Sequence, residues 1–204
     1  MNFLAHFHLA GPDEELITGG LEGDYIKGPL RGELPQGLER GIKLHRAIDA
    51  NTDSHPMIQQ LSRDLLPDLR RYAGILIDLS FDHYLSRHWA IFSAIPIADF
   101  NSEIYRTLTA HAGVLSEGGR VMAARLVEHD VLNLYREWET VLATATRIGQ
   151  RFQRRNPFLE LDQKLSPAQS ALEQAFLNFY PQLQSFSTER AALLRSPEHY
   201  GPLR

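Results

Sequence analysis

The sequence predicts an all-α fold, and three observations support this class. Apolar residues recur at the spacing of helices, proline and glycine interrupt the chain at short intervals, and no alternating run typical of a strand has useful length. The chain has 204 residues, 43% of them hydrophobic, and no linker divides it. This length suffices for one sizeable core, so we expect a single helical domain over residues 1–204.

Helices are expected in order along the first half of the chain. Residues 3–9 form a segment too short to assign. Asp13, followed by two glutamates, caps a helix that should run to about Lys27, where Gly28-Pro29 ends it. After a connector rich in glycine and proline, further helices are expected over 38–53, 57–66 and 75–92.

The second half continues the same pattern. Helices are expected over 98–111, 117–129 and 131–150. Ser166-Pro167 opens a last long helix, which Pro181 should kink or interrupt because proline lacks the N–H of a helix interior.

The helix over 75–92 carries two acids in its apolar stripe. At about 100° per residue, Asp78 and Asp82 share a face with apolar side chains, and His83 follows the second acid. A carboxylate in an apolar setting costs free energy unless it is paired or bound to a cation. The sequence therefore predicts a positive group beside this helix.

Two neighbouring segments offer further oxygen and imidazole ligands. His45 and Asp49 lie four residues apart on the helix over 38–53, so they face the same side. Asp24 follows Gly23 in a helix that also holds Gly19 and Gly20, and such glycines indicate close approach of another backbone or a ligand. Alone, His45 would be a packed core residue and Asp24 an exposed helix end. Together, three helices offer inward ligands.

Composition limits the function classes. The formal net charge of −4 argues against a nucleic-acid-binding protein, which would carry a basic face. The chain has no cysteine, which excludes disulfides and thiolate metal sites. No apolar run approaches the roughly 18 residues that span a bilayer, and the start of the chain lacks the basic region of a signal peptide. We expect a cytoplasmic protein with neither membrane nor nucleic acid as partner, and the oligomeric state stays open.

Short motifs are mostly absent. There is no GxxxxGK loop, GxSxG elbow, HExxH pair or EF-hand spacing. His129-Asp130 matches the consecutive pair of a metal phosphohydrolase, but its polar surroundings favour a surface turn. Of the two histidines in the first segment, His8 is expected to pack, while His6 could line a site.

Four segments together resemble one family. MNFLAHFHLA at the start, GD at 23–24, LHRAID at 44–49 and FDHYLSRHW at 81–89 resemble the acyl carrier protein phosphodiesterases. The resemblance implies an all-helical, metal-dependent phosphodiesterase, an atypical relative of the HD phosphohydrolases with a similar fold. It would hydrolyse the phosphodiester joining 4′-phosphopantetheine to the serine of holo-acyl carrier protein. The products would be apo-acyl carrier protein and 4′-phosphopantetheine.

The resemblance also implies a metal site. It carries over Asp24, His45, Asp82 and His83 as ligands, with Asp78 as a further ligand or as the group that orients the nucleophile. The usual consecutive His-Asp pair is reversed here, so the order of the ligands along the chain is not a safe guide. An oxygen-rich shell without sulfur suits Mn²⁺, with Mg²⁺ or Fe²⁺ as alternatives and Zn²⁺ less favoured.

The implied reaction assigns further roles. A metal-activated water would attack the phosphorus, and Asp78 or Asp49 would handle the proton. Arg46 and Lys27 would neutralise the phosphate, with surface charge as the alternative interpretation.

The basic clusters of the chain allow two interpretations. They are either solvated faces or a docking surface for an acidic partner, which the resemblance identifies as the carrier protein. The docking candidates are Arg40, Lys43, Arg151, Arg154 and Arg155.

Two other functions stay open. One is a metal-dependent phosphohydrolase of nucleotides or other small phosphoesters. The other is a non-enzymatic helical binding module, in which the inward Asp and His side chains form a structural polar network.

Overall fold

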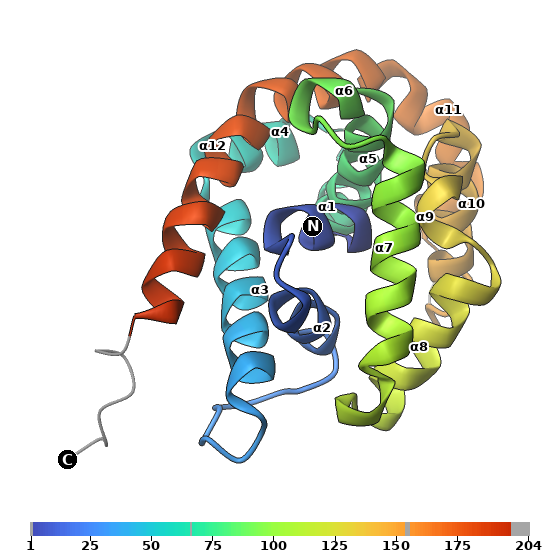
Figure 1. The fold of residues 1–204 in the computed structure, drawn as a ribbon. Coiled ribbons are helices and arrows are strands. Elements are labelled where there is room, and N and C mark those ends of the chain that lie inside the picture. Colours follow the sequence, from blue (N-terminus) through green and yellow to red (C-terminus); the bar gives the residue numbers. More distant parts are fainter. Residues whose placement is uncertain (1, 66, 154–155, 197–204) are drawn as a thin grey trace.

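The computed structural model describes residues 2–65, 67–153 and 156–196, and these residues form helices without any strand (Figure 1). The all-α prediction is confirmed. The helices up to residue 92 are α1 (Phe3–Ala10), α2 (Glu14–Glu22), α3 (Gln36–Ser54), α4 (Pro56–Asp64), α5 (Ala73–Arg87) and α6 (Trp89–Phe92). The later helices are α7 (Ile97–Ala110), α8 (Glu117–Glu128), α9 (Val131–Leu134), α10 (Trp138–Gly149), α11 (Leu161–Leu165) and α12 (Gln169–Arg195). Short 3-10 turns are η1 (Arg70–Tyr72), η2 (Ala112–Val114), η3 (Pro157–Glu160) and η4 (Ser166–Ala168).

The segment that was too short to assign, α1, lies at the centre of the fold. It packs against α2, α3, α5 and α12 (Figure 1), and most of its residues are buried. A helix this short is not stable alone in water, so tertiary contacts must hold it. At its start, Asp82 of α5 accepts hydrogen bonds from the backbone N–H groups of Leu4 and Ala5 at 2.9 and 3.0 Å. At its end, Ser187 of α12 donates to the carbonyl of Leu9 at 2.8 Å.

Glycines bring α2 and α3 together backbone to backbone. A Cβ on Gly19 would lie 2.4 Å from the carbonyl oxygen of Leu38 and 2.7 Å from the Cα of Gly41. Both distances are far below a van der Waals contact, so neither Gly19 nor Gly41 can carry a side chain here. The close backbone approach expected at Gly19 is confirmed, and it sets the end of α2 directly over α3.

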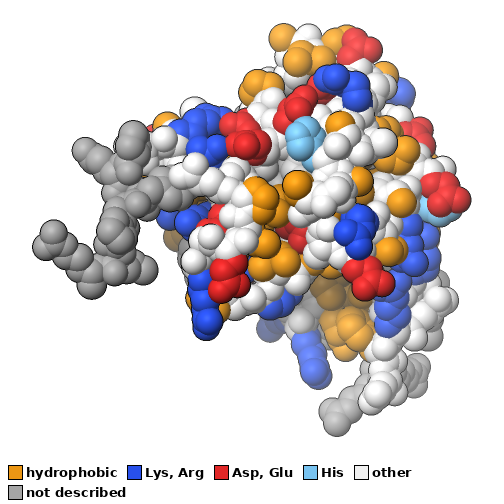
Figure 2. Space-filling view, turned by 60° about the horizontal axis from the view of Figure 1, so that its bottom comes forward, with side chains coloured by type: hydrophobic (Ala, Val, Ile, Leu, Met, Phe, Trp, Pro, Cys, Tyr) orange, Lys and Arg blue, Asp and Glu red, His pale blue; other side chains and the backbone are white. Residues whose placement is uncertain are grey.

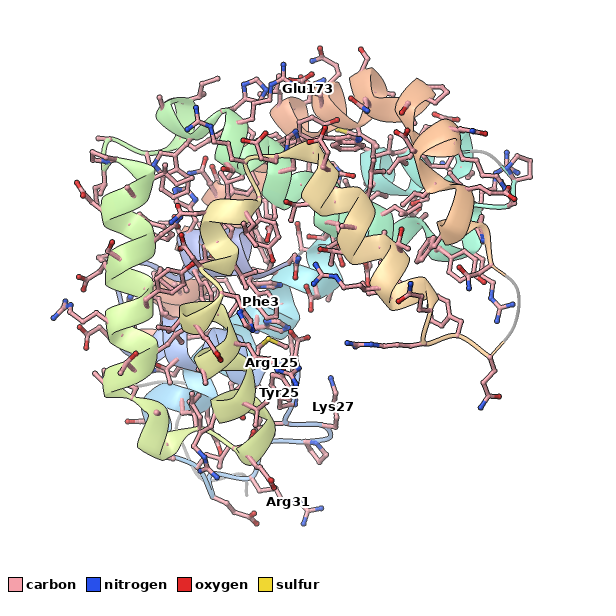
Figure 3. The ribbon with its side chains drawn as sticks, turned by 90° about the vertical axis from the view of Figure 1, so that its right-hand side faces the viewer. Phe3, Tyr25, Lys27, Arg31, Arg125 and Glu173 are labelled. Atoms are coloured by element: carbon pink, nitrogen blue, oxygen red, sulfur yellow. The ribbon has the colours of Figure 1, made fainter. Side chains whose placement is uncertain are left out.

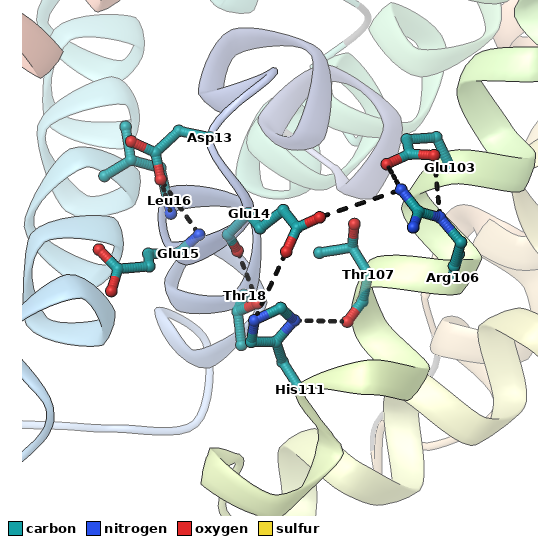
Figure 4. Close-up of polar contacts among 9 residues, drawn as sticks. All are labelled: Asp13, Glu14, Glu15, Leu16, Thr18, Glu103, Arg106, Thr107 and His111. Atoms are coloured by element: carbon teal, nitrogen blue, oxygen red, sulfur yellow. Dashed lines mark hydrogen bonds and ion pairs between the residues drawn. The ribbon is translucent and has the colours of Figure 1, made fainter.

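Side chains anchor the start of α2 to neighbouring helices. Asp13 caps the helix as predicted, because its Oδ1 accepts from the N–H groups of Glu15 and Leu16 at 3.1 Å. Glu14 pairs with Arg106 of α7 at 4.0 Å and with His111, the residue after α7, at 3.6 Å (Figure 4). Arg195 of α12 donates to Asp13 at 2.8 Å.

Several predicted boundaries differ from the structure. The first expected helix ends at Glu22 rather than near Lys27, so Asp24 lies in the loop that follows. The helices expected over 75–92 and 131–150 are each divided, into α5 and α6 and into α9 and α10. Pro181 is predicted to kink or interrupt the last helix; the interruption is wrong, because α12 continues through Pro181, and the helix curves over the core (Figure 1).

The surface shows no single-sign field on the face seen in Figure 2. Basic and acidic side chains alternate over that face, with apolar side chains between them (Figure 2). None of the helices among the described residues is long and apolar enough to cross a bilayer. The expected cytoplasmic location stays a prediction.

Candidate metal centre

Two histidines from different helices meet at one carboxylate. His6 of α1 and His45 of α3 stack with ring centroids 4.0 Å apart and 17° between the ring planes. The Nε2 atom of His6 lies 3.1 Å from Oδ1 of Asp49, and the Nε2 atom of His45 lies 3.1 Å from Oδ2. In the described residues, these three side chains form the one group of His, Asp or Glu residues whose ligand atoms all lie within 4.8 Å of one another.

Asp24 adds a second carboxylate at the edge of this group. Its Oδ1 lies 3.6 Å from Nε2 of His45. Gly23 makes the approach possible, because a Cβ there would lie 2.3 Å from the His45 ring. A shallow pocket of about 280 Å³ opens beside these residues and is lined by Asp24, Lys27, His45, Arg46 and Asp49. We call it the Asp24 pocket.

Burial and hydrogen bonds set the protonation of His6 and Asp49. Burial, with a smaller contribution from the neighbouring His45, lowers the pKa of His6 to about 3, so His6 is neutral near pH 7. Burial opposes ionisation of Asp49, but the hydrogen bonds from His45 and His6 outweigh it and hold the pKa of Asp49 below its usual range. A neutral imidazole and an ionised carboxylate are the forms that bind metal ions.

The donor set fits one divalent cation. Neighbouring ligands of an octahedral ion lie about 3 Å apart when each is about 2.1 Å from the metal. The two separations of 3.1 Å between Asp49 and the Nε2 atoms match that spacing, whereas Asp24, 3.6 Å from His45, lies at the edge of the group. Within the described residues, the buried Nδ1 atoms of His6 and His45 have no hydrogen-bond partner, so each ring makes its polar contacts through the Nε2 atom that faces Asp49. Two imidazole nitrogens and the carboxylate of Asp49, with Asp24 at the edge and without sulfur, are ligand types that suit Mn²⁺ or Fe²⁺.

Arg46 holds the loop that carries Asp24. Its guanidinium donates to the carbonyl of Ile26 at 2.5 Å and to the carbonyl of Gly28 at 2.7 Å. Lys27 lies in that loop, lines the Asp24 pocket and is exposed. Lys27 can therefore make the predicted contact with the phosphate, whereas Arg46 uses guanidinium N–H groups to hold the loop in position.

Asp82 and His83 are not brought into this group. Both oxygens of Asp82 bind the start of α1, as described above, and Nδ1 of His83 donates to the carbonyl of Tyr135 at 2.9 Å. Burial raises the pKa of Asp82 to about 7 although the N–H groups of Ala5 and Leu4 favour its ionised form. The positive group predicted beside α5 is thus the N-terminal end of α1, whose backbone N–H groups carry partial positive charge.

Asp78 lines a different pocket, between α3, α4 and α5. It lies near Asp53, whose pKa is raised by burial and by the charge of Asp78. Its assigned role as a further ligand or as an orienting group stays a prediction.

The predicted docking residues divide into three groups. Arg40 pairs with Glu15 at 2.5 Å, and Lys43 lies 3.9 Å from Glu39, so their charges are partly neutralised. Arg151 is exposed. Arg154 and Arg155 lie outside the described residues.

His6 is the member of this group that residue patterns did not assign as a ligand. The signal that could have placed it is the HxH spacing in an apolar segment: His6 faces α3, whereas His8 packs among aromatic rings with Nδ1 2.7 Å from the hydroxyl of Tyr180. In a helix over 3–10, residues two apart point to nearly opposite sides, whereas in a strand they would share one face.

Comparison with known proteins places the chain in a family. The family model described as acyl carrier protein phosphodiesterase matches residues 1–183. A relative of that name from Enterobacter sp. (strain 638) is 31% identical over 188 residues, which cover 90% of this chain and 95% of the relative. Another from Escherichia coli O6:H1 is 28% identical over 192 residues, covering 94% of this chain and all of the relative. No solved structure matches, so the likeness to the HD fold stays a prediction. The chain belongs to the acyl carrier protein phosphodiesterase family.

Proposed function

We propose that this chain hydrolyses the phosphodiester between 4′-phosphopantetheine and the serine of holo-acyl carrier protein. The name shared by its relatives supports the substrate. The observation that carries the proposal is the convergence of His6, His45 and Asp49 beside the Asp24 pocket. Two buried imidazoles that meet a partly exposed carboxylate beside one pocket are the arrangement that metal-assisted phosphodiester hydrolysis needs.

His6, His45, Asp49 and Asp24 would hold a divalent cation, and we expect Mn²⁺. A bound divalent cation would supply polarisation of a phosphoryl oxygen and would lower the pKa of water from 15.7 towards about 7. Before a cation binds, the two oxygens of Asp49 lie 3.1 Å from the two Nε2 atoms and hold both imidazoles directed at one point. Asp24 is more exposed than the other three, so it stands between the buried donors and incoming substrate.

Exposed basic side chains on the same side of the molecule as Lys27 support an acidic protein substrate. Lys27, Arg31 and Arg125 lie on one side of the molecule, with Tyr25 among them (Figure 3). All three cations are exposed, and none has an ion pair within the described part of the chain. We propose these three as carrier-protein contacts in addition to Arg151, since charges without partners are free to meet an acidic surface.

The experiment is incubation with holo-carrier protein and Mn²⁺, scored by mass for loss of the phosphopantetheine arm. Wild-type protein should convert the carrier to its apo form, and His45→Ala and Asp49→Ala should not. His129→Ala is the matched control, because His129 is an exposed histidine at the end of α8. Cleavage of free nucleotides with no conversion of the carrier would replace the proposal with a small-molecule phosphohydrolase.

A further inference from the structure

A second pocket lies one helical turn from the metal centre. It has a volume of about 390 Å³ and opens between the end of α3, α4 and the start of α5. We call it the α4 pocket. The residues that line it include Asp53 of α3, Arg63 of α4, Arg70 of η1, and Gly74, Ile77 and Asp78 of α5.

The two pockets follow each other along α3. Asp49 lines the Asp24 pocket, and Asp53, four residues later, lines the α4 pocket. Residues four apart face the same side of a helix and are separated by about 6 Å along its axis. The side chain of Asp49 is 39% exposed, and Asp53 is exposed, so solvent reaches the surface of α3 at both positions. A ligand held at the metal centre can therefore continue along α3 into the α4 pocket.

The lining of the α4 pocket suits a neutral chain of mixed polarity. Two carboxylates, Asp53 and Asp78, and two guanidinium groups, Arg63 and Arg70, line the pocket. The formal charges balance, so the pocket favours neither an anion nor a cation. The carboxylates accept hydrogen bonds from N–H and O–H groups, the guanidinium groups donate to carbonyl oxygens, and Ile77 offers apolar contact.

We propose that the α4 pocket binds the pantetheine arm of the substrate while the phosphate lies at the metal centre. This inference rests on the proposed function. Pantetheine is an uncharged chain with a hydroxyl, two amides and several methylene groups, and each of these has a matching group in the lining. A nucleotide would instead bring a planar base, and the lining described above contains no aromatic side chain.

Gly74 gives a direct way to fill the pocket. A Cβ added at Gly74 meets no atom within 4 Å, and its φ is not in the left-handed region. Gly74 lies in the first turn of α5, where residues with side chains form helix better than glycine. Gly74→Leu should fold normally and place its side chain in the α4 pocket. Gly113 in η2 is the matched control, since a Cβ there also meets nothing within 4 Å and Gly113 does not line the pocket.

The test compares wild type, Gly74→Ala, Gly74→Leu and Gly113→Leu on three substrates with Mn²⁺. Holo-carrier protein and a short phosphopantetheinyl-serine peptide carry the arm, and bis(4-nitrophenyl) phosphate does not. Gly74→Leu should raise KM for both arm-bearing substrates about tenfold or more, the scale of a steric block in a binding pocket, and leave the third substrate within about twofold. Gly74→Ala should have a smaller effect, and Gly113→Leu should match wild type.

Three results would overturn the subsite, and they differ from failure of the proposed function. Unchanged kinetics of Gly74→Leu on holo-carrier would refute it while hydrolysis by wild type stands. A defect with holo-carrier but not with the peptide would mean that the α4 pocket contacts the carrier protein instead. If wild type cleaves neither arm-bearing substrate, the proposed function fails, and an NMR titration with pantetheine then tests the α4 pocket alone. Chemical-shift changes in wild type that Gly74→Leu abolishes would support the pantetheine site. The absence of such changes would refute it.

Discussion

The imidazoles of His6 and His45 stack 4.0 Å apart and direct their Nε2 atoms at the two oxygens of Asp49. This contact joins the start of the chain to the middle of α3. His6 reaches it only because α1 is held in place at both ends, by Asp82 and by Ser187. The candidate metal centre therefore depends on side chains that do not belong to it.

Gly23→Ala should displace His45 and reduce activity. The new Cβ would lie 2.3 Å from the imidazole, so the ring must move. A misplacement of about 1 Å can cost about 100-fold in rate, and we expect kcat/KM with holo-carrier to fall by about that factor. Gly20→Ala is the control, because its Cβ meets nothing within 4 Å. Equal activity of the two variants would contradict the placement of His45 against Gly23.

Asp82→Ala should destabilise the protein even without metal. The change leaves the buried N–H groups of Leu4 and Ala5 without acceptors, and each such loss costs about 1–3 kcal/mol. Urea unfolding in EDTA should show a loss of about 2 kcal/mol or more. Asp82→Asn keeps one acceptor oxygen and should lose less. If Asp82 served only as a metal ligand, its removal in EDTA would leave stability unchanged or improve it.

His8 should make stability depend on pH. Burial lowers its pKa to about 4, below the 6.5 of an exposed histidine. As pH falls from 6.5 towards 4, the unfolded chain takes up the proton first, so this contribution is complete above pH 6.5 and is lost on acidification. Between pH 7 and pH 4.5, wild type should lose about 2–3 kcal/mol more unfolding free energy than His8→Phe. His6 titrates in both proteins, so the difference reports His8, and parallel curves would disprove its burial as a neutral side chain.

Charge reversal on the side of the molecule that carries Lys27 should weaken carrier binding. Arg31→Glu and Arg125→Glu should each raise KM for holo-carrier about tenfold at low salt, and the effect should shrink at high salt because screening weakens exposed charges. Arg147→Glu on α10 is the control, since Arg147 is an exposed arginine whose Nε donates to Ala143 in its own helix. A KM that does not respond to salt or to either reversal would exclude electrostatic docking at this surface.

Helical periodicity predicted the fold class and the pair on α3. His45 and Asp49 are one turn apart, and that spacing alone puts both on one face. The glycines before Asp24 likewise indicated a close approach, which the structure shows between Gly19 and Gly41 and between Gly23 and His45. Local spacing was sufficient wherever one helix or one close contact decided the geometry.

Asp82 shows where residue patterns were insufficient. Its position in an apolar stripe correctly predicted burial and a positive neighbour. The neighbour is the start of α1, a helix too short to recognise from its sequence and stable only through contacts with distant segments. For the same reason His6 could not be assigned to the group beforehand, since its direction depends on how α1 packs against α3.

The central claim is that His6, His45 and Asp49 hold one divalent cation, and Mn²⁺ binding followed by electron paramagnetic resonance tests it most directly. Wild type and His129→Ala should remove the signal of free Mn²⁺ at one equivalent, whereas His6→Ala, His45→Ala and Asp49→Ala should leave it free while remaining folded. The account would be contradicted if these three variants bound Mn²⁺ as wild type does, or if a folded His83→Ala variant alone lost the ion.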